Sequence, residues 1–251
     1  MRSDLFAPSH AEAQTTHAGL TLQNSKMLKV ALNGDVVARQ GAMVAYQGQM
    51  NFEGLGAGGI GKFLKQHLTG EGIPLMRVSG QGDLFLADRA ADVFLIDLEG
   101  DNDGLTINGA NVLAFESSLS WDLHRVQGAG MLSTSGLFNC LFTGRGRIAI
   151  TCKGAPVVLN VDQPTYADPQ AAVCWSAGLR TGFHRADQIG IGTLLGRSSG
   201  ESFTMSFAGQ GFVVVQPSEE PAGGFVSGTG SGEQAGQAGL GGVLGGILGG
   251  R

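Results

Sequence analysis

The stretch STSGLFNCLFTGRGRIAITC, residues 133–152, has two apolar runs separated by a G-x-G triplet. Two further stretches align with it without a gap: TGEGIPLMRVSGQGDLFLAD, residues 69–88, and SSGESFTMSFAGQGFVVVQP, residues 198–217. The first glycines of the triplets are Gly80, Gly144 and Gly209, at spacings of 64 and 65 residues. Regular self-similarity of this kind indicates an architecture built from repeated units.

Each unit predicts a β-hairpin, because glycines supply the positive φ angles that tight turns between paired strands require. In the second unit Ile148, Ile150 and Cys152 recur at a period of two, which places one face of a strand on a core. The similarity extends beyond the triplets, since ADVFLIDLEG (91–100) resembles APVVLNVDQP (155–164) and VLAFESSL (112–119) resembles AVCWSAGL (172–179).

A related unit precedes these three, with a predicted turn at Asn33-Gly34-Asp35 and a GAMVAY segment (41–46) that resembles GANVLAF (109–115). Many short strands separated by Gly, Asn and Asp predict an all-β sandwich or barrel of hairpin modules. We expect residues 1–217 to form this single domain. Helix is the minority, and IGKFLKQHLTG (60–70) is the one stretch with helical spacing of apolar residues.

The composition changes after Val215, and residues 218–251 are rich in Gly, Ser and Ala. Such a segment buries too little apolar surface to offset its backbone entropy, so we expect a disordered tail. Its end, GLGGVLGGILGG (239–250), has apolar residues at helical spacing, and a lipid-touching role is the alternative interpretation. Twelve residues are too few to span a bilayer.

The charge balance argues against nucleic-acid binding. The chain has 251 residues, of which 42% are hydrophobic, and 16 Lys+Arg against 21 Asp+Glu give a net charge of −5. A negative protein repels a phosphate backbone. The first residues contain an acid, Asp4, and no apolar run typical of a secretory signal, so we expect a cytoplasmic protein.

The cysteines and histidines predict no local metal site. Cys140, Cys152 and Cys174 include no CxxC pair, and we expect them to be buried reduced thiols. The histidines are scattered singly, and a metal site assembled in space stays an open alternative. They are His10, His17, His67, His124 and His184.

The stretch GLGAGGIGKF, residues 54–63, matches two nucleotide-binding patterns in part. A phosphate-binding loop needs Ser or Thr after the lysine, but Phe63 follows Lys62. A dinucleotide fingerprint needs a parallel strand–helix–strand unit, which an antiparallel all-β chain does not supply. We therefore predict a connector and no nucleotide or other cofactor.

The acidic stretch DLEGDNDGLTI, residues 97–107, resembles a calcium-binding loop, with Glu99, Asp101 and Asp103 at ligand positions. The twelfth position is Ala110, which has no carboxylate for the ion. A hairpin turn at Asp103-Gly104 is the favoured interpretation, and weak calcium binding is the alternative.

No catalytic arrangement is predicted either. Ser118, Ser120, Asp122 and His124 lie close in sequence, but alternating strand residues do not have the geometry of a catalytic triad. Trp121 and Trp175 are expected to pack in the core rather than stack on bases. The sequence thus names no catalytic, cofactor-binding or metal-binding residue.

Five segments in order resemble the family named for altered inheritance of mitochondria. They are GAMVAY (41–46), GGIGKFLKQHLTGEG (58–72), GQGDLFLAD (80–88), GANVLAFE (109–116) and GESFTMSFAGQGFVVVQ (200–216). The resemblance implies a double-stranded β-helix or sandwich related to the tryptophan-responsive RNA-binding attenuation protein, commonly assembled as a trimer. It implies no established enzyme activity. The RNA binding of that protein and the mitochondrial inner-membrane setting of fungal relatives are not carried over.

We therefore expect a non-enzymatic scaffold or interaction protein that self-associates, with a homotrimer favoured and its open sheet edges paired in the oligomer. A further protein partner is expected but not identified. The alternative from another class is a module that binds a small ligand or metal in a pocket between β-layers. A third possibility is a peripheral membrane organiser that uses residues 239–250.

Overall fold

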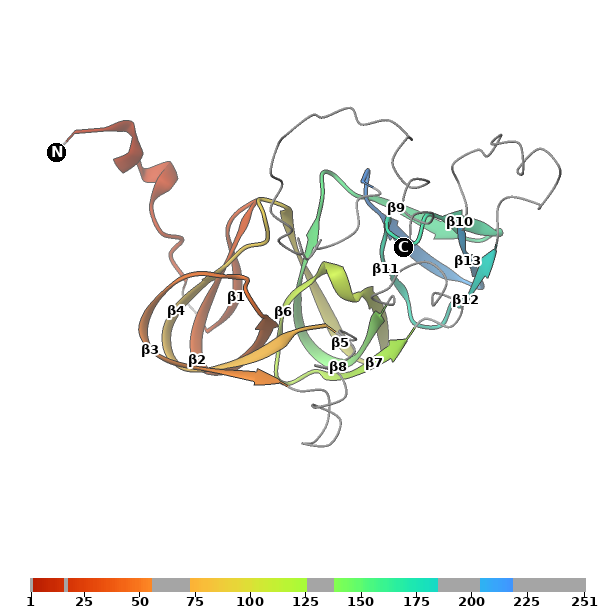
Figure 1. Cartoon of the computed structure of the whole chain (residues 1–251), viewed down its shortest axis with the longest axis horizontal. Coiled ribbons are helices and arrows are strands. Elements are labelled where there is room, and N and C mark those ends of the chain that lie inside the picture. The colour runs from red at the N-terminus through yellow and green to blue at the C-terminus, as the bar shows by residue number, and fades with distance from the viewer. Residues whose placement is uncertain (1, 16–17, 56–72, 126–137, 185–203, 219–251) are drawn as a thin grey trace, which may run out of the picture.

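The structure of the chain is a computed structural model, shown in Figure 1. It describes residues 2–15, 18–55, 73–125, 138–184 and 204–218. The predicted helix at 60–70, most of the glycine-rich stretch at 54–63 and the tail from 219 lie outside the described residues. The prediction of an all-β chain is confirmed, since regular structure in the described residues is strand apart from three short 3-10 helices. None of the described helices is long and apolar enough to cross a membrane.

The strands of the first half are β1 (Gly19–Asn24), β2 (Met27–Arg39), β3 (Met43–Leu55), β4 (Leu75–Leu86), β5 (Asp92–Asn108), β6 (Val112–Glu116) and β7 (Ser120–Arg125). Those of the second half are β8 (Phe138–Cys152), β9 (Val157–Val161), β10 (Thr165–Ala167), β11 (Ala172–Ser176), β12 (Arg180–His184), β13 (Thr204–Ala208) and β14 (Gly211–Val215). The 3-10 helices are η1 (Asp4–Phe6), η2 (Pro8–His10) and η3 (Gly109–Asn111).

The strands form two antiparallel sheets. The larger has eleven strands, in the order β3-β4-β2-β6-β8-β5-β11-β14-β9, with β1 paired to β2 and β7 to β8. The smaller has the order β10-β13-β12. This order divides into three sets of three neighbouring strands: β3-β4-β2, β6-β8-β5 and β11-β14-β9. In each set the middle strand is the one that comes last in the sequence. Figure 1 shows β1–β4, β5–β8 and β9–β14 following one another along the long axis of the molecule.

The glycine triplets do not form the predicted hairpin turns. Gly80 and Gly144 lie inside the long strands β4 and β8, and the pairing of β4 with β2 continues without a break on both sides of Gly80. The predicted turn at Asn33-Gly34-Asp35 is likewise inside β2. Near Gly209 the strand does break, but β13 and β14 pair with different neighbours rather than with each other. Positive φ at a glycine therefore bends these strands instead of reversing them.

The predicted turn at Asp103-Gly104 is also wrong. β5 pairs with β8 on both sides of this point, from Gly100 opposite Gly144 to Leu105 opposite Phe142, so the intervening residues form a bulge. The Asp103 carboxylate accepts a hydrogen bond from the Glu99 backbone N–H at 2.8 Å. A side chain that satisfies the backbone donor allows the strand to continue after the bulge.

The core consists of three apolar clusters that follow the three sets of strands. Edge-to-face aromatic pairs lie in two of them: Phe115 with Phe142 at 4.9 Å and Trp175 with Phe207 at 5.4 Å between ring centroids. Trp121 packs against the cluster of the second set, with its ring 5.7 Å from that of Phe115. Both tryptophans therefore pack as predicted.

An N-terminal arm, residues 2–15, projects from the β1–β4 end of the molecule (Figure 1). Its root is held by the buried Lys29, whose Nζ donates to Glu12 Oε1 at 2.5 Å and to the Ala13 carbonyl at 2.9 Å. Asp83 Oδ2 lies 3.4 Å from the same nitrogen. Burial opposes the charge on Lys29, but the hydrogen bond to Glu12 and the charge of Asp83 outweigh it and raise the Lys29 pKa. The hydrogen bond from Lys29 lowers the pKa of Glu12.

Replacing Lys29 by Met should lower the free energy of unfolding by about 2 kcal/mol, because two carboxylates lose a buried cation. Lys26→Met is the control, since Lys26 is half exposed in its ion pair with Asp92 and should cost under about 1 kcal/mol. Urea unfolding measures both. Equal effects of the two variants would contradict this account of the anchor.

The arm's attachment should depend on pH at both extremes. The Glu12 contact stabilises the folded chain above the ordinary carboxyl pKa and is lost as the pH falls through the lowered one. The Lys29 contact is present below the ordinary lysine pKa and is lost as the pH rises through the raised one. Limited proteolysis of the arm measures the release.

Candidate functional site

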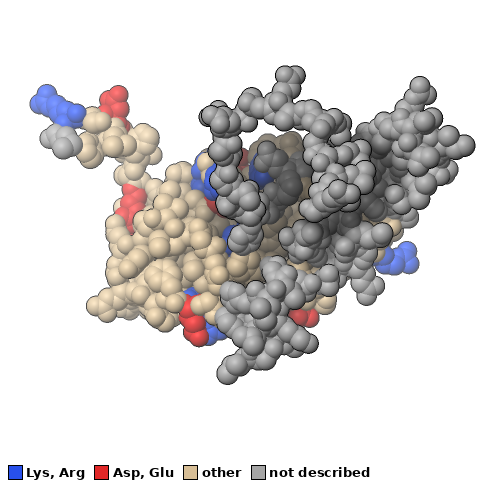
Figure 2. All heavy atoms as spheres, in the orientation of Figure 1, with Lys and Arg blue, Asp and Glu red and all other residues tan. Residues whose placement is uncertain are grey.

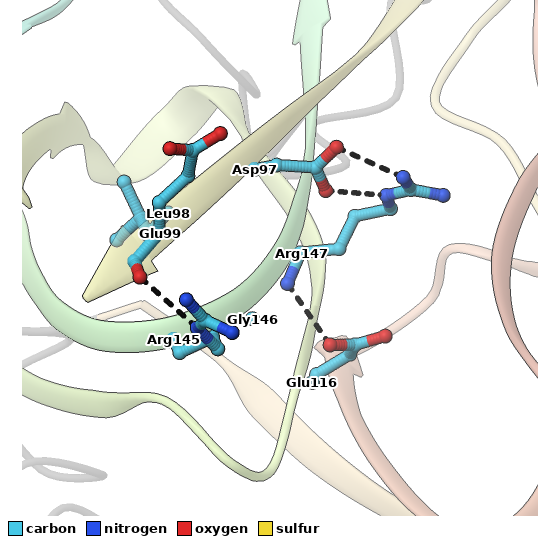
Figure 3. Close-up of a pocket in the computed structure, with 7 residues that line it drawn as sticks. All are labelled: Asp97, Leu98, Glu99, Glu116, Arg145, Gly146 and Arg147. Carbon is cyan, nitrogen blue, oxygen red and sulfur yellow. Dashed lines mark hydrogen bonds and ion pairs between the residues drawn. The ribbon is translucent and has the colours of Figure 1, made fainter.

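A polar pocket of about 480 Å³ lies where β5, β6 and β8 meet (Figure 3). On β5 and β8 the residues Asp97 and Arg147 lie directly opposite each other, as do Glu99 and Arg145. Asp97 accepts two hydrogen bonds from the Arg147 guanidinium, at 2.6 and 2.9 Å. Glu116 comes from the end of β6 and accepts from the Arg147 backbone N–H at 3.0 Å. Cross-strand pairing of opposite charges thus shapes this pocket.

The ion pair with Arg147 fixes the charge state of Asp97 in the pocket. The hydrogen bonds from Arg147 lower the pKa of Asp97, so this carboxylate stays ionised at neutral pH and cannot donate a proton there. The same pairing raises the pKa of Arg147. The Arg145 Nε donates to the Glu99 carbonyl at 3.0 Å, and Arg145 itself is exposed. The pocket offers charged, mostly paired groups to solvent.

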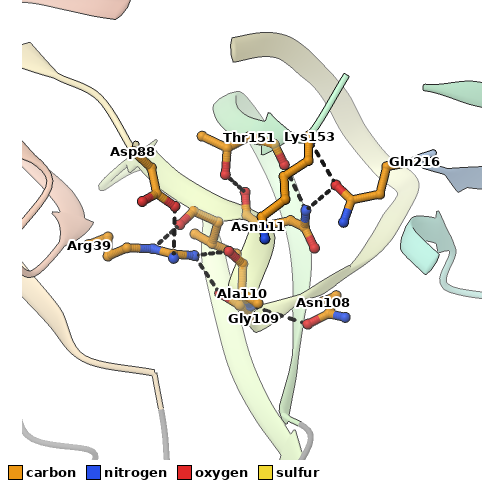
Figure 4. Close-up of polar contacts among 10 residues, drawn as sticks. Arg39, Asp88, Asn108, Gly109, Ala110, Asn111, Thr151, Lys153 and Gln216 are labelled. Carbon is orange, nitrogen blue, oxygen red and sulfur yellow. Dashed lines mark hydrogen bonds and ion pairs between the residues drawn. The ribbon is translucent and has the colours of Figure 1, made fainter. Parts of the chain in front are cut away.

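A buried polar network surrounds η3, and its centre is Arg39 at the end of β2 (Figure 4). The Arg39 Nε donates to the Val112 carbonyl at 2.9 Å, and Nη2 donates to the carbonyls of Gly109, at 3.0 Å, and Ala110. Nη1 lies 3.3 Å from Asp88 Oδ2. Burial lowers the pKa of Arg39, although a guanidinium remains charged at neutral pH. One side chain thus joins the first set of strands to the second.

The network continues from η3 into the third set. Asn108 Nδ2 lies 3.2 Å from the Pro169 carbonyl and 3.3 Å from that of Ala172. On the other side Asn111 Nδ2 donates to the Thr151 carbonyl at 2.7 Å. Both asparagines are buried, and buried amides need such partners.

Gln216, just after β14, completes the network (Figure 4). Its Oε1 accepts from the Lys153 backbone N–H at 2.9 Å and lies 3.3 Å from Asn111 Nδ2. Its Nε2 donates to the Gln170 carbonyl at 3.2 Å. Sequence reasoning missed these residues. The available signal was the polar residue shortly before each GA[MN] segment, namely Arg39 before 41–46 and Asn108 before 109–115.

An exposed apolar surface lies on β3, a thirteen-residue strand at one edge of the large sheet. We call it the β3 surface, and define it by Met43, Val44, Tyr46 and Phe52, which are 36–54% exposed. At the other edge, β9 also exposes Val157 and Val158. The visible face over β1–β4 is mostly free of charged side chains (Figure 2). A long apolar edge strand is a template for pairing with another chain.

The residues considered for nucleophilic catalysis lie along β7 and in the turn before it. Ser118 lies in the turn after β6, and Ser120, Asp122 and His124 alternate along β7. His124 Nε2 is 3.5 Å from Asp122 Oδ2, and both side chains are more than half exposed. The described residues include no group of three His, Cys, Asp or Glu side chains that could hold a metal ion.

The three cysteines are buried free thiols, as predicted. Burial raises the pKa values of Cys140, Cys152 and Cys174 to about 12. Because only the thiolate is a strong nucleophile, we expect negligible reaction with Ellman's reagent in the native protein at pH 8. Reaction should reach three thiols per chain in denaturant. Rapid native labelling of any one of them would contradict this placement.

Fold and site together define an all-β protein in which successive sets of strands are joined by buried polar contacts and the edge strand β3 exposes apolar side chains. A family model described as mitochondrial biogenesis AIM24 matches residues 20–218, and the chain belongs to this family. The X-ray crystal structure of a Streptococcus pyogenes protein is similar, with a TM-score of 0.62 and 21% identity over 80% of this chain and 92% of the other. That likeness concerns the fold alone. No curated protein matches the sequence.

Proposed function

We propose that the protein is a non-enzymatic scaffold that self-associates through its open sheet edges, most simply as a homotrimer, and presents the assembled surface to a protein partner. The β3 surface carries this proposal. Burying its apolar side chains against another copy would be favourable at about 25 cal/mol per Å² of apolar area. It would also cover an edge that is otherwise open to aggregation. Family membership is compatible with the proposal without assigning a molecular role.

Light scattering coupled to size exclusion tests the self-association. We expect a mass of three chains, or about 77 kDa if each has 25.8 kDa, at micromolar concentration. A strict monomer would overturn the proposal. Pull-down from cells with the full chain then identifies the partner, and recovery of a stoichiometric small molecule instead would contradict a scaffold-only role.

The pocket of Figure 3 favours a second candidate function, the binding of a small polar ligand. Its support is the exposed Arg145, which lines the pocket together with the carboxylate of Glu116, so that a ligand with both charges would find a partner for each. Native mass spectrometry of the protein from cells, with elemental analysis, tests it. A mass equal to the chain alone, or an integer multiple of it, would reject this candidate.

A cytoplasmic setting is part of the scaffold proposal, and residues 239–250 are its proposed point of peripheral membrane contact. Co-sedimentation with anionic liposomes compares the full chain with a chain ending at Gln216. Equal binding by the two would reject any contribution of the tail to lipid contact.

A further inference from the structure

The three sets of strands are joined twice in the same way. β2 of the first set pairs antiparallel with β6 of the second, and β5 of the second pairs antiparallel with β11 of the third. At the first junction Val37 lies opposite Phe115, and at the second Thr106 lies opposite Trp175. Each junction therefore places an aromatic residue across from a strand of the preceding set.

Tyr46 on β3 occupies the place that these aromatic residues have in their own sets. In each set the aromatic residue lies directly opposite an aliphatic residue of the set's middle strand. The three aliphatic residues lie at the same distance after the first glycine of their triplets. The pairs are Tyr46 with Leu84, Phe115 with Ile148, and Trp175 with Val213.

The burial of these aromatic residues differs in one respect. Phe115 and Trp175 are 0% and 3% exposed, whereas Tyr46 is 47% exposed. Tyr46 nevertheless packs edge-to-face on Phe52 at 5.4 Å and 63°, as Phe115 packs on Trp121 at 5.7 Å and 63°. The aromatic residue is thus buried where its strand pairs with the preceding set of the same chain, and it is exposed on β3, which is an edge strand.

The complementary position is found at the other end of the chain. Val37 lies opposite Arg77, Thr106 opposite Leu141, and Tyr166 on β10 opposite Ser206. Arg77, Leu141 and Ser206 stand at the same distance before Gly80, Gly144 and Gly209. Tyr166 is therefore equivalent in position to Val37 and Thr106, the residues that lie opposite the aromatic residues at the two internal junctions. It is 55% exposed and lies on an edge strand of the small sheet.

We propose that β10 of one copy pairs antiparallel with β3 of a second copy, with Tyr166 opposite Tyr46, and so repeats between chains the junction found twice within the chain. The proposal rests on the self-association proposed above and specifies its contact. Two different edges meet, so the contact is heterologous and closes into a ring if the rotation permits. Cross-strand aromatic pairs favour such an alignment.

The contact between copies differs from the internal junctions in one feature. At these junctions Arg39 donates to the Gly109 and Val112 carbonyls, and Asn108 Nδ2 lies within hydrogen-bonding distance of two carbonyls of the third set. The residue after β10 is Asp168, an acceptor, and its carboxylate caps its own turn by accepting from the Gln170 N–H at 2.7 Å. The contact between copies lacks a donor side chain equivalent to Arg39 or Asn108, so we expect it to be weaker than the internal junctions. A weaker contact is consistent with chains that fold first and assemble afterwards.

Disulfide trapping tests the register. Full-length chains carrying Tyr46→Cys and Tyr166→Cys are prepared separately, mixed, and oxidised; the native thiols are buried and do not interfere. We expect a cross-linked dimer in the mixture and none in either variant alone, because opposite positions bring Cβ atoms within disulfide range. Tyr46→Cys mixed with Phe94→Cys, which is also exposed, is the matched control.

The other outcomes separate this contact from self-association itself. Cross-linking by Tyr46→Cys alone would show a two-fold contact and overturn the head-to-tail arrangement. An uncross-linked mixture, with wild-type protein still oligomeric by light scattering, would overturn the contact and leave self-association standing. A monomeric wild type would overturn both. If a cysteine variant fails to fold, Tyr46→Lys and Tyr166→Glu are used: each alone should reduce the oligomer mass, and a chain that carries both changes should recover it, because every contact then places opposite charges across the strands.

Discussion

Replacing Arg39 by Ala should lower the free energy of unfolding by about 3 kcal/mol, among the largest effects of any polar substitution in the described part of the chain. Arg39 supplies the donor for the carbonyls of Gly109, Ala110 and Val112 and pairs with Asp88. Its side chain is only 16% exposed, so water replaces these hydrogen bonds poorly. The melting temperature should fall by about 6–12 °C.

Two further variants separate the hydrogen bonds of Arg39 from its charge. Arg39→Lys keeps one positive charge but lacks the planar fork, so it should recover part of the loss. Arg77→Ala removes an arginine that is half exposed and 3.6 Å from Asp35, and should change stability by less than about 0.5 kcal/mol. Differential scanning calorimetry measures all three. If Arg39→Ala had the same melting temperature as Arg77→Ala, the hydrogen bonds of Arg39 around η3 would contribute nothing to joining the first two sets of strands.

Arg39 also shows why the sequence predicted the fold class better than the contacts. Period-two alternation and the repeated triplets depend on local spacing, which is visible in one dimension. The partners of Arg39 lie about 70 residues away, and no local pattern indicates that a guanidinium will meet three carbonyls of a 3-10 turn. Buried polar contacts of this kind need the strand order, which the sequence does not display.

The hairpin error has a different cause. A glycine with positive φ fits a tight turn and a bent strand equally well, and local sequence does not distinguish them. The structure decides through pairing: β2 and β4 stay in register from Leu28 opposite Leu86 to Arg39 opposite Leu75. The exposed β3 surface was beyond prediction for a similar reason, since Tyr46 and Phe115 lie in like segments and only the sheet order places one at an edge.

Gly82 should be the glycine of β4 least tolerant of substitution. It lies opposite Gly48 of β3, at φ +136°, and a Cβ built there would stand 1.9 Å from the Gln47 carbonyl oxygen. That atom belongs to the backbone of a paired strand and cannot move aside without breaking the β3–β4 ladder. Gly82→Ala should therefore cost about 4 kcal/mol or more, the sum of backbone strain and a main-chain clash.

Two other glycines divide this cost into its parts. Gly34 has φ +131° with nothing within 4 Å of a built Cβ, so Gly34→Ala should show strain alone, about 1–2 kcal/mol. Gly178 has open space and no positive φ, and Gly178→Ala should be nearly neutral. Urea unfolding should rank the losses Gly82, Gly34, Gly178. If Gly82→Ala cost no more than Gly34→Ala, Gly82 would be needed only for its positive φ angle. The close approach of β3 to β4 would then not explain the second glycine of the G-x-G triplet.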